Sequence, residues 1–144
     1  AGLVGSEMCI RDSRMDSLAI KIDRAFINDK FRALIPFQLV WDDVEYTTET
    51  LVAAPISQKL MNKLTITYPD KGGYTPGDAY DIFFDEDYII REWSYRKGNA
   101  KEPNLSNTFK KYQDFNGLKI TQDHKKEKSD WSLPIRNIKV ELVE

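Results

Sequence analysis

Carboxylates and aromatic side chains gather in one stretch of the sequence, residues 73–99, GYTPGDAYDIFFDEDYIIREWSYRKGN. Its acidic residues are Asp78, Asp81, Asp85, Glu86, Asp87 and Glu92. Two carboxyl groups that face each other across a cleft could hydrolyse a glycosidic bond, provided that one of them is held protonated. Acidic residues between strands are also ordinary turn residues. The acids therefore allow two interpretations, a carboxylate-dependent hydrolase or a set of solvent-exposed turns.

Other catalytic and metal-binding patterns are missing from the sequence. His124 is the single histidine and Cys9 the single cysteine, whereas a zinc site needs several imidazole or thiolate ligands. The glycines Gly72, Gly73 and Gly77 lack the lysine and hydroxyl partners of a phosphate-binding loop. The acidic clusters do not follow the spacing of a twelve-residue calcium loop. We assign no catalytic residue, no metal ligand and no cofactor from the sequence.

The aromatic residues suggest a different chemistry, the binding of an apolar molecule. They recur along the strands that we expect after residue 73, and a curved sheet could present them on its concave side. The candidate ligand-binding residues are Tyr80, Trp93, Tyr95 and Tyr112. The alternative is that these side chains form the core between the sheet and a helix.

Length and charge limit the functional classes. The chain has 144 residues, of which 31% are charged and 41% hydrophobic, with a net charge of -2. These values are typical of a single globular domain with one core. Nucleic-acid partners are not expected, because such proteins usually carry a clustered basic face. No apolar stretch approaches the roughly 20 residues of a membrane-spanning helix, so we expect no transmembrane segment.

The first thirteen residues, AGLVGSEMCIRDS, differ from the remainder of the chain. They lack the basic and apolar regions of a signal peptide. The string MCIRDS resembles the translated end of a transposon-based sequencing adaptor. We therefore expect residues 1–13 to be a non-native leader and residues 14–144 to form a single β-rich domain.

One amphipathic helix is predicted at the start of this domain. In residues 16–34 apolar side chains recur every three or four positions, as on one face of a helix. We expect Pro36 to end the helix, because a proline disfavours helical geometry in the residue before it. The apolar run Phe37–Trp41, FQLVW, then suggests a short strand.

The remaining sequence predicts antiparallel strands joined by turns. Strands are expected at residues 64–68, 79–84, 88–97, 108–115 and 118–126, and residues 131–133 and 135–143 together give a final strand. Asn116-Gly117 is the strongest hairpin signal, because both residues accept the positive φ of a type I′ turn. Residues 42–50 show no clear period, and residues 98–107 form a predicted polar loop around Pro103. We expect His124 to lie on a surface strand.

The predicted fold is therefore α+β. It consists of a curved, meandering antiparallel sheet of about six or seven strands, with one N-terminal helix packed on one face. Helix and strand do not alternate, so nothing predicts a parallel sheet.

Several segments together resemble a known family. They are PFQLVWD at residues 36–42, APIS at 54–57, LTITYPDKGGYTPGDAYDIFF at 64–84, REWSYRKGN at 91–99 and DFNGLKI at 114–120. They are similar to a family of Bacteroidetes proteins that are typically exported or lipid-anchored, with a sheet like that of the outer-membrane lipoprotein carriers (the LolA-like fold). No established catalytic residues accompany the resemblance.

The resemblance implies a location and a partner. The chain would be the C-terminal part of a longer precursor, whose signal peptide or lipid anchor and first strands lie upstream. Its location would be the periplasm or the outer membrane. Together with the aromatic residues, this predicts a non-catalytic protein that binds an apolar or lipid-like ligand on a concave antiparallel sheet. The alternatives are a carboxylate-dependent hydrolase and a structural or interaction module that uses an exposed sheet edge.

Overall fold

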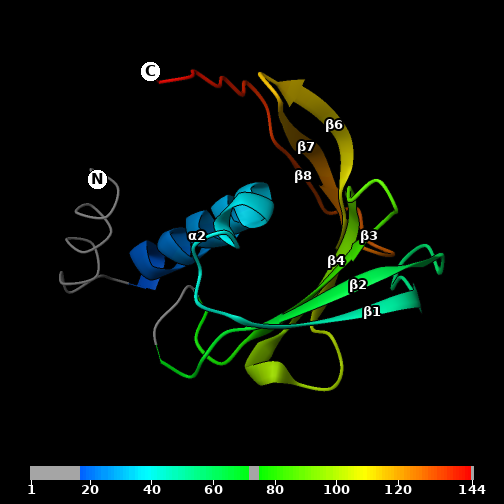
Figure 1. Ribbon diagram of the computed structural model, residues 1–144. Helices are drawn as coiled ribbons and strands as arrows, with labels where there is room; N and C mark the ends of the chain where they lie inside the picture. The colour runs from blue at the N-terminus through cyan, green and yellow to red at the C-terminus, as the bar shows by residue number, and fades with distance from the viewer. Residues whose placement is uncertain (1–16, 72–74, 144) are drawn as a thin grey trace. The chain divides into compact units, whose positions relative to one another are not determined.

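The computed structural model describes residues 17–71 and 75–143 (Figure 1). The leader at residues 1–13, with Cys9, and residues 72–74, with two of the glycines considered above, lie outside these ranges. The chain divides into two units, residues 1–35 and residues 36–144. All of the strands belong to the second unit.

The helix is present but is longer than predicted. Helix α2 spans Ser17–Gln38 and contains Pro36 in its last turn. Proline has no N–H to donate within the helix, but so close to the C-terminal end this costs a single hydrogen bond. The helix therefore continues past the predicted end. Residues 37–41 form the end of the helix and a turn, so the strand that we predicted there was wrong.

The strands form two antiparallel sheets. Strands β1 (Glu45–Ala53), β2 (Leu60–Thr67), β3 (Ala79–Phe84), β4 (Ile90–Arg96) and β5 (Leu105–Thr108) pair in sequence order in a five-stranded sheet. Strands β6 (Lys110–Phe115), β7 (Leu118–Lys125) and β8 (Ser132–Pro134) form a three-stranded sheet. A short 3₁₀ helix, η1 (Lys97–Asn99), follows β4. One helix followed by antiparallel sheets confirms the α+β class.

The two sheets are joined by the segment β5–Phe109–β6, in which Phe109 alone separates the two strands. Strand β5 pairs with β4, and the N–H of Phe109 extends this pairing by donating to the carbonyl of Arg91 at 2.7 Å. Strand β6 pairs with β7, and a bridge between Asn107 and Lys126 brings the end of β7 beside β5. Within each sheet every strand pairs with the next in sequence, and β5 continues through Phe109 into β6.

Two irregularities in the strand register bend the five-stranded sheet. Strand β1 has an extra residue between Glu49 and Val52, and β4 has an extra residue, Arg91, between the partners of Phe83 and Phe84. An extra residue on one strand of a pair bends that strand and increases its twist. The curvature that was expected of this sheet therefore has a local cause in these two strands.

Several strand predictions need correction. Residues 42–50 contain most of β1, whose side chains are nearly all exposed, so that no apolar alternation marks the strand. Residues 98–107 were predicted as a loop but contain the start of β5. Residues 135–143 carry an alternating pattern, yet β8 ends at Pro134 and no strand forms after it in the described chain. The described residues hold eight strands rather than six or seven.

One face of the meander carries a row of stacked rings. Tyr80 stacks on Trp93 with ring centroids 5.1 Å apart, and Trp93 meets Phe109 edge-on at 6.0 Å. Phe109 in turn meets the ring of His124 edge-on at 4.4 Å. His124 is fully buried, so its predicted place on a surface strand was wrong. These rings, which cross from β3 to β7, form the core of this face.

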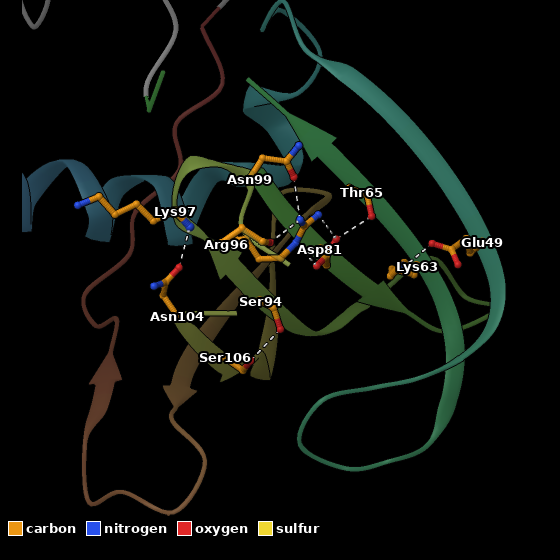
Figure 2. Close-up of polar contacts among 11 residues, drawn as sticks. Glu49, Lys63, Thr65, Asp81, Ser94, Arg96, Lys97, Asn99, Asn104 and Ser106 are labelled. Atoms are coloured by element: carbon orange, nitrogen blue, oxygen red, sulfur yellow. Dashed lines mark hydrogen bonds and ion pairs between the residues drawn. The ribbon is translucent and has the colours of Figure 1, made fainter. Parts of the chain in front are cut away.

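The opposite face carries a ladder of polar side chains, shown in Figure 2. Thr65 of β2 donates to Asp81 of β3 at 2.7 Å, and Arg96 of β4 donates to both oxygens of Asp81 at 2.8 and 3.2 Å. Ser94 of β4 bonds Ser106 of β5 at 2.7 Å. Strands β2 to β5 are thereby tied to their neighbours by side chains as well as by the backbone.

The planar shape of the Arg96 guanidinium should contribute more to the stability of the fold than its charge does. Its remaining nitrogen donates to Asn99 at 2.7 Å and to the carbonyl of Ala100 at 2.9 Å. Arg96→Lys keeps the charge but cannot form all of these bonds, so we expect it to lower the free energy of unfolding by about 1–3 kcal/mol. Denaturant unfolding measures this. Arg136→Lys, at an exposed position, is the matched control, and an equal loss in both variants would contradict the prediction.

Candidate functional site

A cavity of about 680 Å³ opens on the polar face of the sheet, at the end where β3 turns into β4. Its wall is formed by the β1–β2 loop (residues 54–59), Met61 of β2, Asp85 in the β3–β4 turn, the start of β4, and the β5–Phe109–β6 segment. This volume lies within the range of small-molecule sites, about 300–1,000 Å³. We refer to it as the Glu92 cavity, after its most buried charged residue.

Glu92 holds the β1–β2 loop in place. The residue is 3% exposed, and its carboxylate accepts the backbone N–H groups of Ile56 at 2.7 Å and Ser57 at 3.0 Å. These donors lie 36 and 35 residues away in the sequence, so the contact joins the loop to β4. A buried carboxylate is costly unless such donors satisfy it. The loop therefore forms one wall of the cavity because Glu92 binds its backbone.

Apolar side chains lie behind the loop. Ala54, Met61 and Phe83 form a buried cluster, and Val52 of β1 packs against it. Met61 also lines the Glu92 cavity, as does Ile56 at the tip of the loop. The cavity thus has an apolar part next to its charged rim.

Arg91 and two acids close the rim on the side of the β3–β4 turn. The Nε of Arg91 donates to Asp85 at 2.6 Å, and its Nη2 donates to Asp87 at 2.7 Å. Asp85 and Arg91 both line the cavity. Both acids are therefore occupied by the guanidinium, which is half-buried between them.

Tyr112, a predicted ligand-binding residue, lines the Glu92 cavity. Its hydroxyl donates to the carbonyl of Ile90 at 2.8 Å. Burial raises the pKa of the Tyr112 phenol above its ordinary range, because the phenolate would lose its hydration, while the nearby Arg91 charge lowers that pKa in part. Tyr112 thus presents its ring to the cavity with its hydroxyl fixed and protonated.

The other three predicted residues lie elsewhere. Tyr80 and Trp93 are both 3% exposed and stack in the ring row on the opposite face. Tyr95 is half-buried on that face and donates its hydroxyl to Asp78 at 2.8 Å. Burial and the Asp78 carboxylate raise the pKa of the Tyr95 phenol. The structure therefore does not bring these three together with Tyr112 around the Glu92 cavity.

The acids of residues 78–92 also take separate places. Asp85 and Glu92 line the same cavity. Asp81 belongs to the polar ladder, and Asp78 accepts the N–H of Gly98 at 2.7 Å as well as the Tyr95 hydroxyl. Glu86 and Asp87 are exposed in the turn. Sequence reasoning had selected this acidic stretch but could not identify Glu92, because its partners Ile56 and Ser57 are distant in the sequence.

Three further observations bear on the site. Within residues 17–71 and 75–143, no three histidine, cysteine or acidic side chains are grouped as metal ligands would be. No helix in the described part of the chain has the length and apolar character needed to cross a membrane. Comparison of the chain with protein-family models, curated proteins and solved structures gave no match.

Glu92→Gln should release the β1–β2 loop. The amide keeps the shape of the carboxylate, but only one of its two terminal atoms can accept an N–H, so we expect a loss of about 1–3 kcal/mol in the free energy of unfolding. Faster hydrogen exchange at the amides of Ile56 and Ser57 would report the loosened loop. Glu86→Gln, in the exposed turn, is the control. Unchanged exchange at both amides in Glu92→Gln would refute the role assigned to this carboxylate.

The two raised phenol pKa values predict a loss of stability at alkaline pH. The phenols of Tyr95 and Tyr112 have higher pKa values in the folded chain than the ordinary value of about 10. Their contribution is complete below about pH 10 and is lost as the pH rises from there through the folded-state values. We expect the double variant Tyr95→Phe, Tyr112→Phe to lose less stability above about pH 10 than the natural chain. Equal pH slopes in urea unfolding would contradict this.

Proposed function

We propose that the chain is a non-catalytic binding protein for an apolar or lipid-like ligand, and that the Glu92 cavity is its site. The observation that carries the proposal is a cavity of about 680 Å³ with Met61 and Ile56 in its wall and the ring of Tyr112 at its side. Binding sites of this size typically combine apolar and aromatic lining with a few polar groups.

The carboxylates and the tyrosine hydroxyl that line the cavity already have hydrogen-bond or ion-pair partners, which supports binding rather than catalysis. The carboxylate of Glu92 holds two backbone N–H groups, and that of Asp85 is paired with Arg91. The hydroxyl of Tyr112 is bonded to a carbonyl. Groups that are held in this way shape and orient a site. A general acid or base needs its proton-exchanging atoms directed at the substrate.

A hydrolase is the second candidate, because Asp85 and Glu92 line one cavity. A glycosidase mechanism requires one carboxyl group to be protonated and to reach the leaving oxygen. Both carboxylates are instead occupied by internal partners, the backbone N–H groups of Ile56 and Ser57 for Glu92 and the guanidinium of Arg91 for Asp85. A structural module that pairs through the exposed edge strand β1 is the remaining alternative.

The proposed function also implies a cellular location for the protein. We infer a periplasmic or outer-membrane protein of the LolA-like family, with a lipid anchor or signal peptide upstream. Its support is the set of segments named in the sequence analysis and a meandering antiparallel sheet. The reading frame of the complete gene would test it, since a lipoprotein signal upstream supports the proposal and a continuous cytoplasmic domain overturns it.

A neutral fluorescent probe tests the proposed binding. We expect N-phenyl-1-naphthylamine, an uncharged aromatic amine, to increase in fluorescence when it is added to the chain. Ser57→Trp places a large ring in the cavity wall while it keeps the backbone N–H that bonds Glu92. We expect this variant to bind the probe about tenfold more weakly, which corresponds to about 1.4 kcal/mol.

The control is Lys101→Trp, in the exposed loop after η1. It adds the same side chain outside the cavity, so the probe should bind it as it binds the natural chain. If the probe does not bind the natural chain at all, the proposed function is wrong. If both tryptophan variants bind it equally well, the Glu92 cavity is not the site.

A further inference from the structure

The lining of the Glu92 cavity carries more positive than negative charge. Its cations are Lys59, Arg91, Lys110 and Lys111, and its acids are Asp85 and Glu92. The cations come from three different parts of the chain, the β1–β2 loop, β4 and β6. A concave wall lined by one sign of charge attracts a ligand of the opposite sign.

The cations differ in whether they are already paired. Arg91 is bound to Asp85 and Asp87. Lys111 lies 3.8 Å from Asp123. By contrast, among the described residues no carboxylate forms an ion pair with the ammonium groups of Lys59 and Lys110, and both lysines are exposed. These two groups are therefore free to meet a ligand.

The acids of the cavity do not neutralise the positive charge of Lys59 and Lys110. Glu92 is satisfied by Ile56 and Ser57, and its burial places it away from the rim. Asp85 is satisfied by Arg91. A ligand that enters past Lys59 and Lys110 thus meets positive charge first, and then Met61 and the Tyr112 ring in the wall of the same cavity.

We propose that the ligand of the Glu92 cavity is an anionic amphiphile, a molecule with a carboxylate or phosphate group attached to an apolar body. Its anionic group lies between Lys59 and Lys110, and its apolar body lies against Met61, Ile56 and Tyr112. This rests on the proposed function and adds the charge and polarity of the ligand. Lysine suits the role because its ammonium group offers three rotatable donors on a flexible stem.

Calorimetric titration with four small probes tests the charge requirement. The probes are decanoate, an anionic amphiphile; decyl glucoside, a neutral one; decyltrimethylammonium, a cationic one; and acetate, a free anion. Each is used below its micelle concentration at low salt. We expect decanoate to bind about tenfold more tightly than decyl glucoside and acetate, and decyltrimethylammonium to bind most weakly. Because exposed charges are screened by salt, the advantage of decanoate should shrink as salt is added.

The double variant Lys59→Met, Lys110→Met tests whether these two lysines bind the anionic group of the ligand. Methionine keeps much of the apolar stem of lysine and removes the ammonium group. We expect decanoate to bind this variant about tenfold more weakly, about threefold per lysine, while decyl glucoside binds it unchanged. Lys71→Met, Lys101→Met is the matched control, with two exposed lysines that do not line the cavity.

Each outcome decides a different claim. Equal binding of decanoate and decyl glucoside overturns the anionic ligand and leaves the proposed function standing. Acetate that binds as tightly as decanoate overturns the amphiphile in favour of a simple anion. An equal loss of decanoate binding in both double variants shows a general charge effect and overturns the assignment to Lys59 and Lys110. If none of the three amphiphiles binds, the proposed function itself fails.

Discussion

The buried carboxylate of Glu92 is the interaction on which the site depends. It stands on β4, near the middle of the meander, and binds the backbone of a loop that is distant in sequence. Removing a carboxylate from water is unfavourable unless donors replace the lost hydration, and the two N–H groups do so. The same bonds place Ile56 and Ser57 at the cavity wall. Stability and site geometry therefore have one cause in this part of the molecule.

The two faces of the sheet have different roles. On one face the rings from Tyr80 to His124 pack in a continuous row and are buried. On the other face, polar side chains connect the strands and leave a cavity at one end. The rings in this buried row thus stabilise the fold. The residues that a ligand would meet come from the loop, the rim and the start of β6.

Local sequence signals predicted the local structure well. The bounds of β3 agree with the prediction, and the turn at Asn116-Gly117 has positive φ at both residues, 55° and 90°. The long-range features could not be predicted in this way. Strand β1 has exposed side chains and so no apolar period, and the alternation after Pro134 finds no neighbouring strand in the described chain. The Glu92 cavity requires contacts between residues 35 or more positions apart, which no sequence period encodes.

The segment β5–Phe109–β6 belongs to both sheets, so the unfolding of one sheet affects the other. Residues 105–108 pair with β4, residues 110–115 pair with β7, and the ring of Phe109 lies between Trp93 and His124. If either sheet opened by itself, the shared segment would lose its partners on one side and the ring row would be broken at Phe109. The two sheets should therefore melt together as one cooperative unit, despite being separate in their hydrogen-bond pattern.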